Sequence, residues 1–252
     1  MGKYRRIIGT TRVFIEREEK QLGRKLPTDF VNWIMENNTR SLGGLTIHPI
    51  RDDRNLRQSW DSIAKVYEKW SNNDSIPEQV RNSKIPFADY GTGDVFCFDS
   101  SPDAENSAIF LWPHEHDDTL KFVNCFSEFI DIVEANLLDD EVCFISSTLL
   151  SIEARAGHFL DRFLEVEQIW ALEENNLLLM SEDRLLLWAY EEDAKCYARR
   201  FSPDSEATVI SRDNFLEILN RQDVIESGLG IEANQTNHVS ISVADILRNL
   251  KI

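Results

Sequence analysis

Apolar residues recur at helical spacing in the opening third of the chain. Thr10 or Thr11 can cap a helix that runs to about Gln21, and Gly23 can adopt the left-handed conformation that ends helices. Pro27 suits the first turn of a second helix, because the N–H that proline lacks would be unpaired there. The apolar residues of this second helix follow at matching intervals: Phe30, Val31, Ile34 and Met35. Two helices are therefore predicted before residue 40.

A longer apolar stripe follows a short strand-like segment at residues 45–49. Its members step by four, three, four and three residues: Leu56, Trp60, Ile63, Tyr67 and Trp70. Such spacing places all five side chains on one side of a helix that starts near Asp53. We interpret the stripe as core packing, in preference to a platform for a ligand.

From residue 85 the pattern changes to that of β-strands. Four short segments are rich in aromatic and β-branched residues: 85–89, 94–98, 108–112 and 119–123. If neighbouring strands pair antiparallel, the turn at 90–93 and the loop at 113–118 lie at the same end of the sheet. Asp99, Asp103 and Glu105 then lie at the opposite end. A helix from Ser127 to about Asn136 completes this part of the chain.

Residues 137–157 mix charged and apolar residues without a clear period, and we place a domain boundary near residue 147. The chain then comprises a domain at 1–146 and a smaller domain at 147–252. The second domain again alternates predicted helices and strands. The helices are predicted around 156–166, 191–201, 212–219 and 246–250, and the strands at 168–172, 177–180, 185–188 and 207–210.

Negative charge is concentrated between Ile85 and Glu153. Fifteen acidic residues against the single base Lys121 give this segment a net charge of −14, out of −17 for the whole chain. Such a surface repels nucleic acid and anionic membranes and attracts a basic protein. An open alternative is that the acidity only maintains solubility. The candidate partner-binding residues are the acidic ones from the predicted sheet: Asp89, Asp94, Asp99, Asp103, Glu105, Glu115, Asp117 and Asp118.

The first thirty residues have the opposite charge balance. Eight bases face four acids there, so the molecule is expected to be electrically asymmetric. Because the partner attracted to the acidic segment would be a basic protein, the charge pattern by itself favours an interaction function.

The residues suited to catalysis or metal binding form no convincing site. The segment His114-Glu115-His116-Asp117-Asp118 is the best metal candidate, but no further ligands can be identified, and we interpret it as a solvated acidic loop. The four cysteines show no metal-binding spacing and are expected to be reduced thiols. No signal peptide or membrane span is visible. We therefore expect a cytoplasmic protein that is not an enzyme and needs no cofactor or metal.

The first half also resembles a known family. The run Ile15-x-x-x-Glu19-x-x-Leu22-Gly23-Arg24-Lys25-Leu26-Pro27-x-Asp29-Phe30-x-x-Trp33-Ile34 is similar to the N-terminal signature of the SUKH superfamily. Three further pieces follow in the family's order: Gly43-Gly44, the strand Ile85-Pro86-Phe87-Ala88 with Gly93-Asp94 and Phe98-Asp99 after it, and Phe126-Ser127-Glu128-Phe129-Ile130. The resemblance covers residues 10–136 and departs from the family at Asn37-Asn38, where Asn-Gly is frequent.

The resemblance implies a fold and a function. The fold is α+β, with helices packed on one curved antiparallel sheet, and the smaller α+β domain follows it. Bacterial SUKH proteins are often immunity proteins that bind and neutralise a toxin, frequently a nuclease, and fungal relatives are regulators of cell-wall synthesis and signalling. The alternative is therefore a non-enzymatic regulatory or scaffold module. Residues 155–235 resemble a small bacterial family known only as a domain of unknown function, which implies no chemistry.

Overall fold

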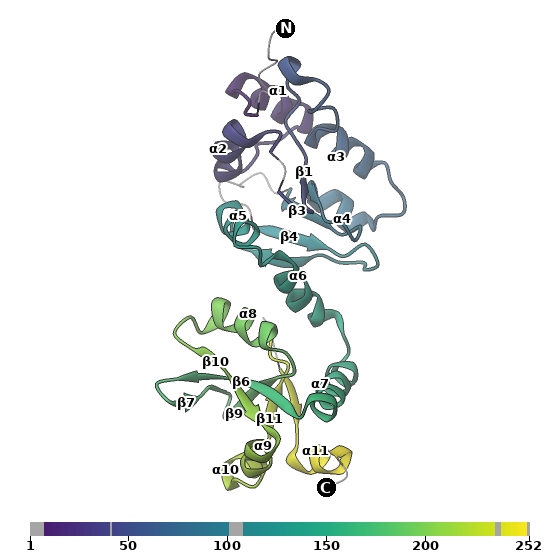
Figure 1. Ribbon diagram of the computed structural model, residues 1–252. Coiled ribbons are helices and arrows are strands. Elements are labelled where there is room, and N and C mark those ends of the chain that lie inside the picture. The colour runs from purple at the N-terminus through teal and green to yellow at the C-terminus, as the bar shows by residue number, and fades with distance from the viewer. Residues whose placement is uncertain (1–7, 41, 101–107, 235–237, 251–252) are drawn as a thin grey trace. The chain divides into compact units, whose positions relative to one another are not determined.

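The chain folds into two compact units, Met1–Leu138 and Asp139–Ile252. The computed structural model describes residues 8–40, 42–100, 108–234 and 238–250 (Figure 1). Each unit combines helices with its own sheet, which confirms the predicted α+β class. The domain boundary expected near residue 147 stays a prediction.

The first unit contains a mainly meandering antiparallel sheet in the order β1-β2-β3-β4-β5. Its strands are β1 (Thr46–Ile47), β2 (Lys84–Asp89), β3 (Val95–Asp99), β4 (Ile109–Trp112) and β5 (Leu120–Val123). Its helices are α1 (Arg12–Leu22), α2 (Thr28–Asn37), the 3₁₀ turn η1 (Asp53–Asn55), α3 (Ile63–Ser71), α4 (Glu78–Ser83) and α5 (Phe126–Glu134). Gly23 ends α1 with a left-handed φ of 72°, as its position predicts.

Successive residues of β3 contact different helices, because side chains alternate across a strand. Phe96 and Phe98 pack with aromatic rings from α2 and α5; the Phe98 ring, for example, lies 5.1 Å from that of Phe30. Val95 and Cys97 belong to a second buried cluster with Trp70 of α3. Helices therefore cover both faces of this sheet.

The predicted helix over the 56–70 stripe is wrong in its first half. Helix α3 begins only at Ile63, and residues 56–60 form turns. Ile63 and Trp70 are buried as expected, but Leu56 is 44 % exposed and Trp60 is 53 % exposed. Core packing is therefore not the role of these two side chains.

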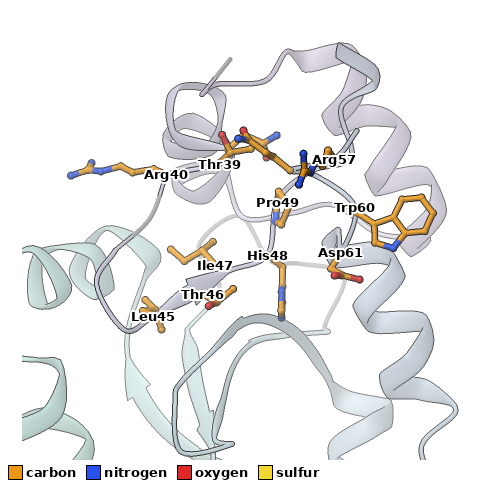
Figure 2. A pocket seen from close by; sticks show the side chains of 12 residues that line it. Thr39, Arg40, Leu45, Thr46, Ile47, His48, Pro49, Arg57, Trp60 and Asp61 are labelled. Atoms are coloured by element: carbon orange, nitrogen blue, oxygen red, sulfur yellow. The ribbon is translucent and has the colours of Figure 1, made fainter. Parts of the chain in front are cut away.

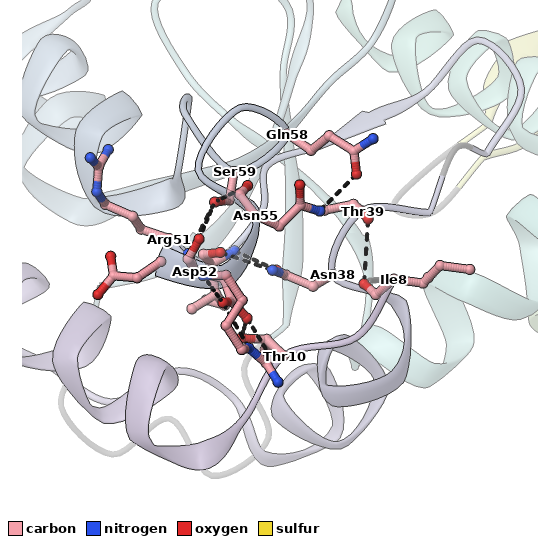
Figure 3. Close-up of polar contacts among 12 residues, drawn as sticks. Ile8, Thr10, Asn38, Thr39, Arg51, Asp52, Asn55, Gln58 and Ser59 are labelled. Carbon is pink, nitrogen blue, oxygen red and sulfur yellow. Dashed lines mark hydrogen bonds and ion pairs between the residues drawn. The ribbon is translucent and has the colours of Figure 1, made fainter. Parts of the chain in front are cut away.

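Buried polar contacts fix the segment that precedes α3 (Figure 3). The carboxylate of Asp52 is fully buried and accepts hydrogen bonds from the Thr10 hydroxyl at 3.0 Å and from the Arg54 backbone at 2.9 Å. The buried Ser59 hydroxyl accepts from the Asp52 N–H at 3.0 Å. Buried polar groups require such partners, so these contacts replace the helix that the apolar spacing predicts.

The second unit has a mixed sheet in the order β10-β6-β9-β11-β12, with β7 paired to β6 and β8 to β9. Its strands are β6 (Gln168–Glu174), β7 (Leu177–Leu178), β8 (Met180–Ser181), β9 (Arg184–Trp188), β10 (Glu206–Ser211), β11 (Leu229–Ile231) and β12 (Val239–Ile241). Its helices are α6 (Leu138–Ser146), the 3₁₀ turn η2 (Ser147–Leu149), α7 (Ile152–Val166), α8 (Glu191–Phe201), α9 (Arg212–Leu219), α10 (Gln222–Ser227) and α11 (Val243–Leu250). Strands β9 and β11 run parallel.

Two cores lie on the two faces of this second sheet. Helices α7, α9 and α11 supply Phe159, Phe215 and Ile246 to the larger core, and α8 packs Ala194 against Trp188 in the smaller one. Helix α6, which lacks a clear apolar period, is held by an ion pair instead. Its buried Glu141 accepts a hydrogen bond from the Arg199 guanidinium of α8 at 2.7 Å.

Candidate functional site

Five of the predicted partner-binding residues lie at one end of the first sheet. We call this group the acidic end; it consists of Asp89, Asp94, Glu115, Asp117 and Asp118. Asp89 pairs with Val95 across the β2–β3 turn, and Val95 pairs in turn with Trp112, after which the 113–119 loop begins. The antiparallel register therefore brings the turn and the loop together, as the sequence pattern predicts.

The Asp94 carboxylate joins the turn to the loop. Its Oδ1 atom lies 2.9 Å from His114 Nδ1 and accepts a hydrogen bond from the His114 backbone N–H at 3.1 Å. The Thr92 hydroxyl donates to Oδ2 at 2.8 Å. Glycine is favoured at position 93 beside them, because its φ of 99° is a conformation that other residues rarely adopt.

These contacts also set the charges of the pair. Burial alone would raise the pKa of Asp94, but hydrogen bonds from His114 and Thr92 outweigh it and lower the pKa. The same hydrogen bond to Asp94 raises the pKa of His114. Asp94 is therefore a structural carboxylate of the acidic end, and His114 offsets part of its charge when protonated.

The other carboxylates of the 113–119 loop are open to solvent. Trp112 Nε1 donates to the backbone carbonyl of His116 at 2.9 Å, and the Gln79 amide of α4 donates to that of Asp117 at 3.0 Å. These contacts fix the backbone of the loop. The side chains of Asp117 and Asp118 are exposed, and neither has an ion pair with any described residue, so both can contact a partner. The side chain of Glu115 is 81 % exposed.

Asp89 completes the acidic end, and Asp99 does not join it. Asp89 is exposed, and one of its oxygens lies 3.4 Å from Nε2 of the buried His48. Asp99 lies at the opposite end of the sheet, 3.4 Å from Lys84 Nζ. Asp103 and Glu105 fall outside the described residues. The structure therefore gathers five of the eight residues and separates Asp99 from them.

Among the described residues, no base of positions 8–30 forms an ion pair with the acidic end. Arg17 binds Asp53 at 2.7 Å, Lys25 binds Glu19 at 2.6 Å, and Arg24 donates to the carbonyl of Ser100. The exposed carboxylates of the loop thus keep their negative field, and a positively charged surface would be attracted to it.

The described residues contain no group of three or more His, Cys, Asp or Glu side chains arranged to hold a metal ion. In the segment 114–118, which was the best metal candidate in the sequence, the His114 ring contacts the Asp94 carboxylate. Among the described helices, none is both long enough and apolar enough to cross a membrane. All four cysteines are free thiols, and burial raises the pKa of Cys97 and Cys196.

The first unit also contains a pocket that the sequence did not reveal. It has a volume of about 380 Å³, and Trp60, Arg57, His48 and Asp61 are among its lining residues (Figure 2). The polar residues between Leu56 and Trp60 gave no signal of the pocket, because they also suit the solvent face of an amphipathic helix. The helical apolar spacing concealed the pocket.

Comparison with known proteins identifies the first half of the chain. None of the curated proteins compared with the chain matches it. The model of the SMI1 / KNR4 family (SUKH-1) matches residues 9–132, which span β1–β5 and most of α5. The SUKH resemblance of the N-terminal signature is therefore confirmed. Residues 9–132 of this chain thus match the SMI1 / KNR4 family (SUKH-1).

Proposed function

We propose that this chain is a bacterial immunity protein whose SUKH-1 domain binds and neutralises a basic protein toxin, a nuclease. The observation that carries the proposal is the acidic end, located in a domain of this family. Its exposed carboxylates have the charge that complements the Lys and Arg side chains of a nucleic-acid-binding cleft. Binding would occlude that cleft and exclude its substrate, without any catalytic step.

The physical basis is a fixed array of negative charges. The loop backbone is held by Trp112, Gln79 and Asp94, so little conformational entropy is lost when its carboxylates meet a partner. Exposed charges mainly accelerate encounter, and this acceleration falls as salt screens the field. A partner large enough to reach beyond the acidic end would also contact the other predicted residues, Asp99, Asp103 and Glu105.

The first test is protection in living cells. The toxin to use is the C-terminal region of a secreted protein encoded next to the gene of this chain. We expect co-expression of the full chain to restore growth of cells that produce this region. Toxicity that persists despite a folded chain would refute the proposal, and several partners of modest affinity in place of one tight partner would favour a regulatory module.

The second test locates the surface. Reversing Glu115, Asp117 and Asp118 to Lys should slow association with that toxin at least about tenfold at low salt and weaken its salt dependence. Stopped-flow kinetics at several salt concentrations measure both. A matched control reverses three exposed acids of the second unit, Asp204, Glu217 and Glu226, and so changes the net charge equally. Equal effects of the two triple variants would place the interface away from the acidic end.

A further inference from the structure

The loop between β1 and α3 presents an exposed tryptophan beside the pocket of the first unit. Trp60 is 53 % exposed, whereas Trp70 and Trp112 of the same unit are each 6 % exposed. Figure 2 shows the Trp60 side chain at one side of the pocket, with Arg57 on the same loop and the ring directed away from His48 and Pro49. Exposed tryptophan and arginine beside a recess are typical of residues that dominate binding energy in protein interfaces.

Buried hydrogen bonds fix the chain that leads to this ring. Ser59, which precedes Trp60, is fully buried, and its hydroxyl lies 2.9 Å from the carbonyl of Asn55. The Asn38 amide accepts from the backbone N–H of Ile50 at 2.6 Å and donates to its carbonyl at 2.9 Å (Figure 3). Because these hydrogen bonds join residues within the first unit, they preorganise the surface for a partner.

Two basic side chains contact the ring, and one of them, Lys65, also pairs with Asp61 at 3.3 Å. The Lys65 ammonium lies 3.9 Å from the centre of the Trp60 ring, and the Arg51 guanidinium carbon lies 5.2 Å from it. Arg57 has no hydrogen bond or ion pair with any described residue, whereas Arg40 turns away from the pocket to Glu134 at 3.0 Å. Residues 40–69 contain six bases and four acids, a net charge of +2 within a chain of −17.

We propose that this surface, which we call the Trp60 surface, binds an acidic segment of a protein partner. An apolar side chain of the segment would pack on the Trp60 ring, and a carboxylate would pair with Arg57 at the rim. A nucleic acid also has bases that stack on tryptophan, but its regularly spaced phosphates would bring several negative charges close to the Asp61 and Asp89 carboxylates. A peptide segment with one carboxylate placed at Arg57 avoids this repulsion. The Trp60 surface is independent of the proposed immunity function, because the acidic end attracts partners of the opposite charge.

A selection of random peptides tests the proposal without a known partner. Peptides of about twelve residues displayed on phage are selected against the full chain, and enriched sequences are synthesised and measured by calorimetry. We expect enriched peptides to be acidic and to contain an apolar residue. Trp60→Ala and Arg57→Glu should each weaken their binding at least about tenfold.

Two control variants separate this effect from general changes in charge or stability. Lys20→Glu matches the charge change of Arg57→Glu, and Val13→Ala removes another exposed apolar side chain; both residues lie on α1 and neither lines the pocket. Both should change affinity less than about twofold. Circular dichroism of each variant shows whether it is folded.

Four outcomes would overturn the proposal. These are no enrichment over the starting library, enrichment of basic peptides only, binding that survives both Trp60→Ala and Arg57→Glu in folded protein, and tighter binding of a single-stranded oligothymidylate than of the acidic peptides. Loss of toxin protection with peptide binding intact would refute the immunity function alone.

Discussion

Two adjacent aspartates have opposite environments. The Asp52 side chain is 1 % exposed, and although its burial favours a raised pKa, the hydrogen bonds from Arg54 and Thr10 lower it. Asp53 pairs with Arg17 at the surface, where its side chain is 57 % exposed. We expect Asp52→Ala to lower the free energy of unfolding by about 3 kcal/mol, because it leaves buried donors unpaired.

The matched variant Asp53→Ala should cost less than about 1 kcal/mol, since exposed ion pairs contribute little. Urea denaturation of both variants at neutral pH measures the difference. Equal losses would mean that the buried contacts of Asp52 do not hold the loop that carries Trp60.

Glu232 makes stability depend on pH. Its carboxylate accepts a hydrogen bond from the Ala189 N–H at 2.8 Å, but burial dominates and raises its pKa from the model-peptide value of 4.5 to about 8. Between these values the folded chain keeps a proton that the unfolded chain releases, so stability is full below pH 4.5 and falls as pH rises towards 8.

Glu232→Gln should remove this contribution, which is up to about 1.4 kcal/mol per pH unit for one proton. Chemical denaturation from pH 5 to 9 gives, for each protein, the slope of the free energy of unfolding against pH. Burial also raises the pKa of Asp193, to about 6, and that slope remains in the variant. Identical profiles for the two proteins would contradict an uncharged Glu232 in the folded state.

At the scale of elements, the apolar stripe of residues 56–70 divides into a buried and an exposed part. The Trp70 ring lies edge-on to that of Trp112 at 5.1 Å, within the cluster that α3 and α4 form on the sheet. Trp70→Ala should therefore destabilise the protein by about 3–5 kcal/mol. Trp60→Ala removes a side chain of the same size and type at the surface, and should cost less than about 1 kcal/mol.

Thermal unfolding followed by circular dichroism compares the two tryptophan variants. A large loss for Trp60→Ala would return this residue to the core role predicted from its spacing. It would also make this variant unsuitable for testing the Trp60 surface, leaving Arg57→Glu for that purpose.

Local patterns predicted much of this fold. Capping residues predicted the start of α1 and its end at Gly23. Alternation predicted the β2–β5 meander, and helical spacing predicted α8. The placement of the acidic end followed from counting turns between antiparallel strands. These features depend on neighbours in sequence, which a single chain displays.

The features that local patterns did not predict depend on contacts between residues far apart in the sequence. The turns before α3 are stabilised by the hydrogen bond between Thr10 and Asp52, which are 42 positions apart. Helix α6 depends on Arg199 and Arg200 for its buried Glu141, and three-residue β11 depends on a parallel partner. The pocket beside Trp60 combines α2, β1 and the 57–61 loop. None of these pairings can be read from apolar spacing.

At the scale of the whole molecule, the two units have separate cores. Phe215 is fully buried in the second unit, with its ring 4.9 Å from that of Phe163. We expect heat to unfold the chain in two steps, because separate cores need not melt together. Scanning calorimetry should show a van't Hoff enthalpy below the calorimetric one.

The same two-step behaviour predicts where core substitutions act. Phe215→Ala should lower the midpoint of one transition, and Trp70→Ala should lower that of the other. A single transition that both variants shift equally would show that the units unfold as one.

The parallel pairing of β9 with β11 has a consequence for the order in which the chain acquires its structure. On the ribosome, the meander of the first unit can form as its strands emerge in succession. The second sheet cannot be completed in this way, because β9 must wait about forty residues for its parallel partner β11. Until the last segments leave the exit tunnel, one edge of β9 is exposed to chaperones and to aggregation.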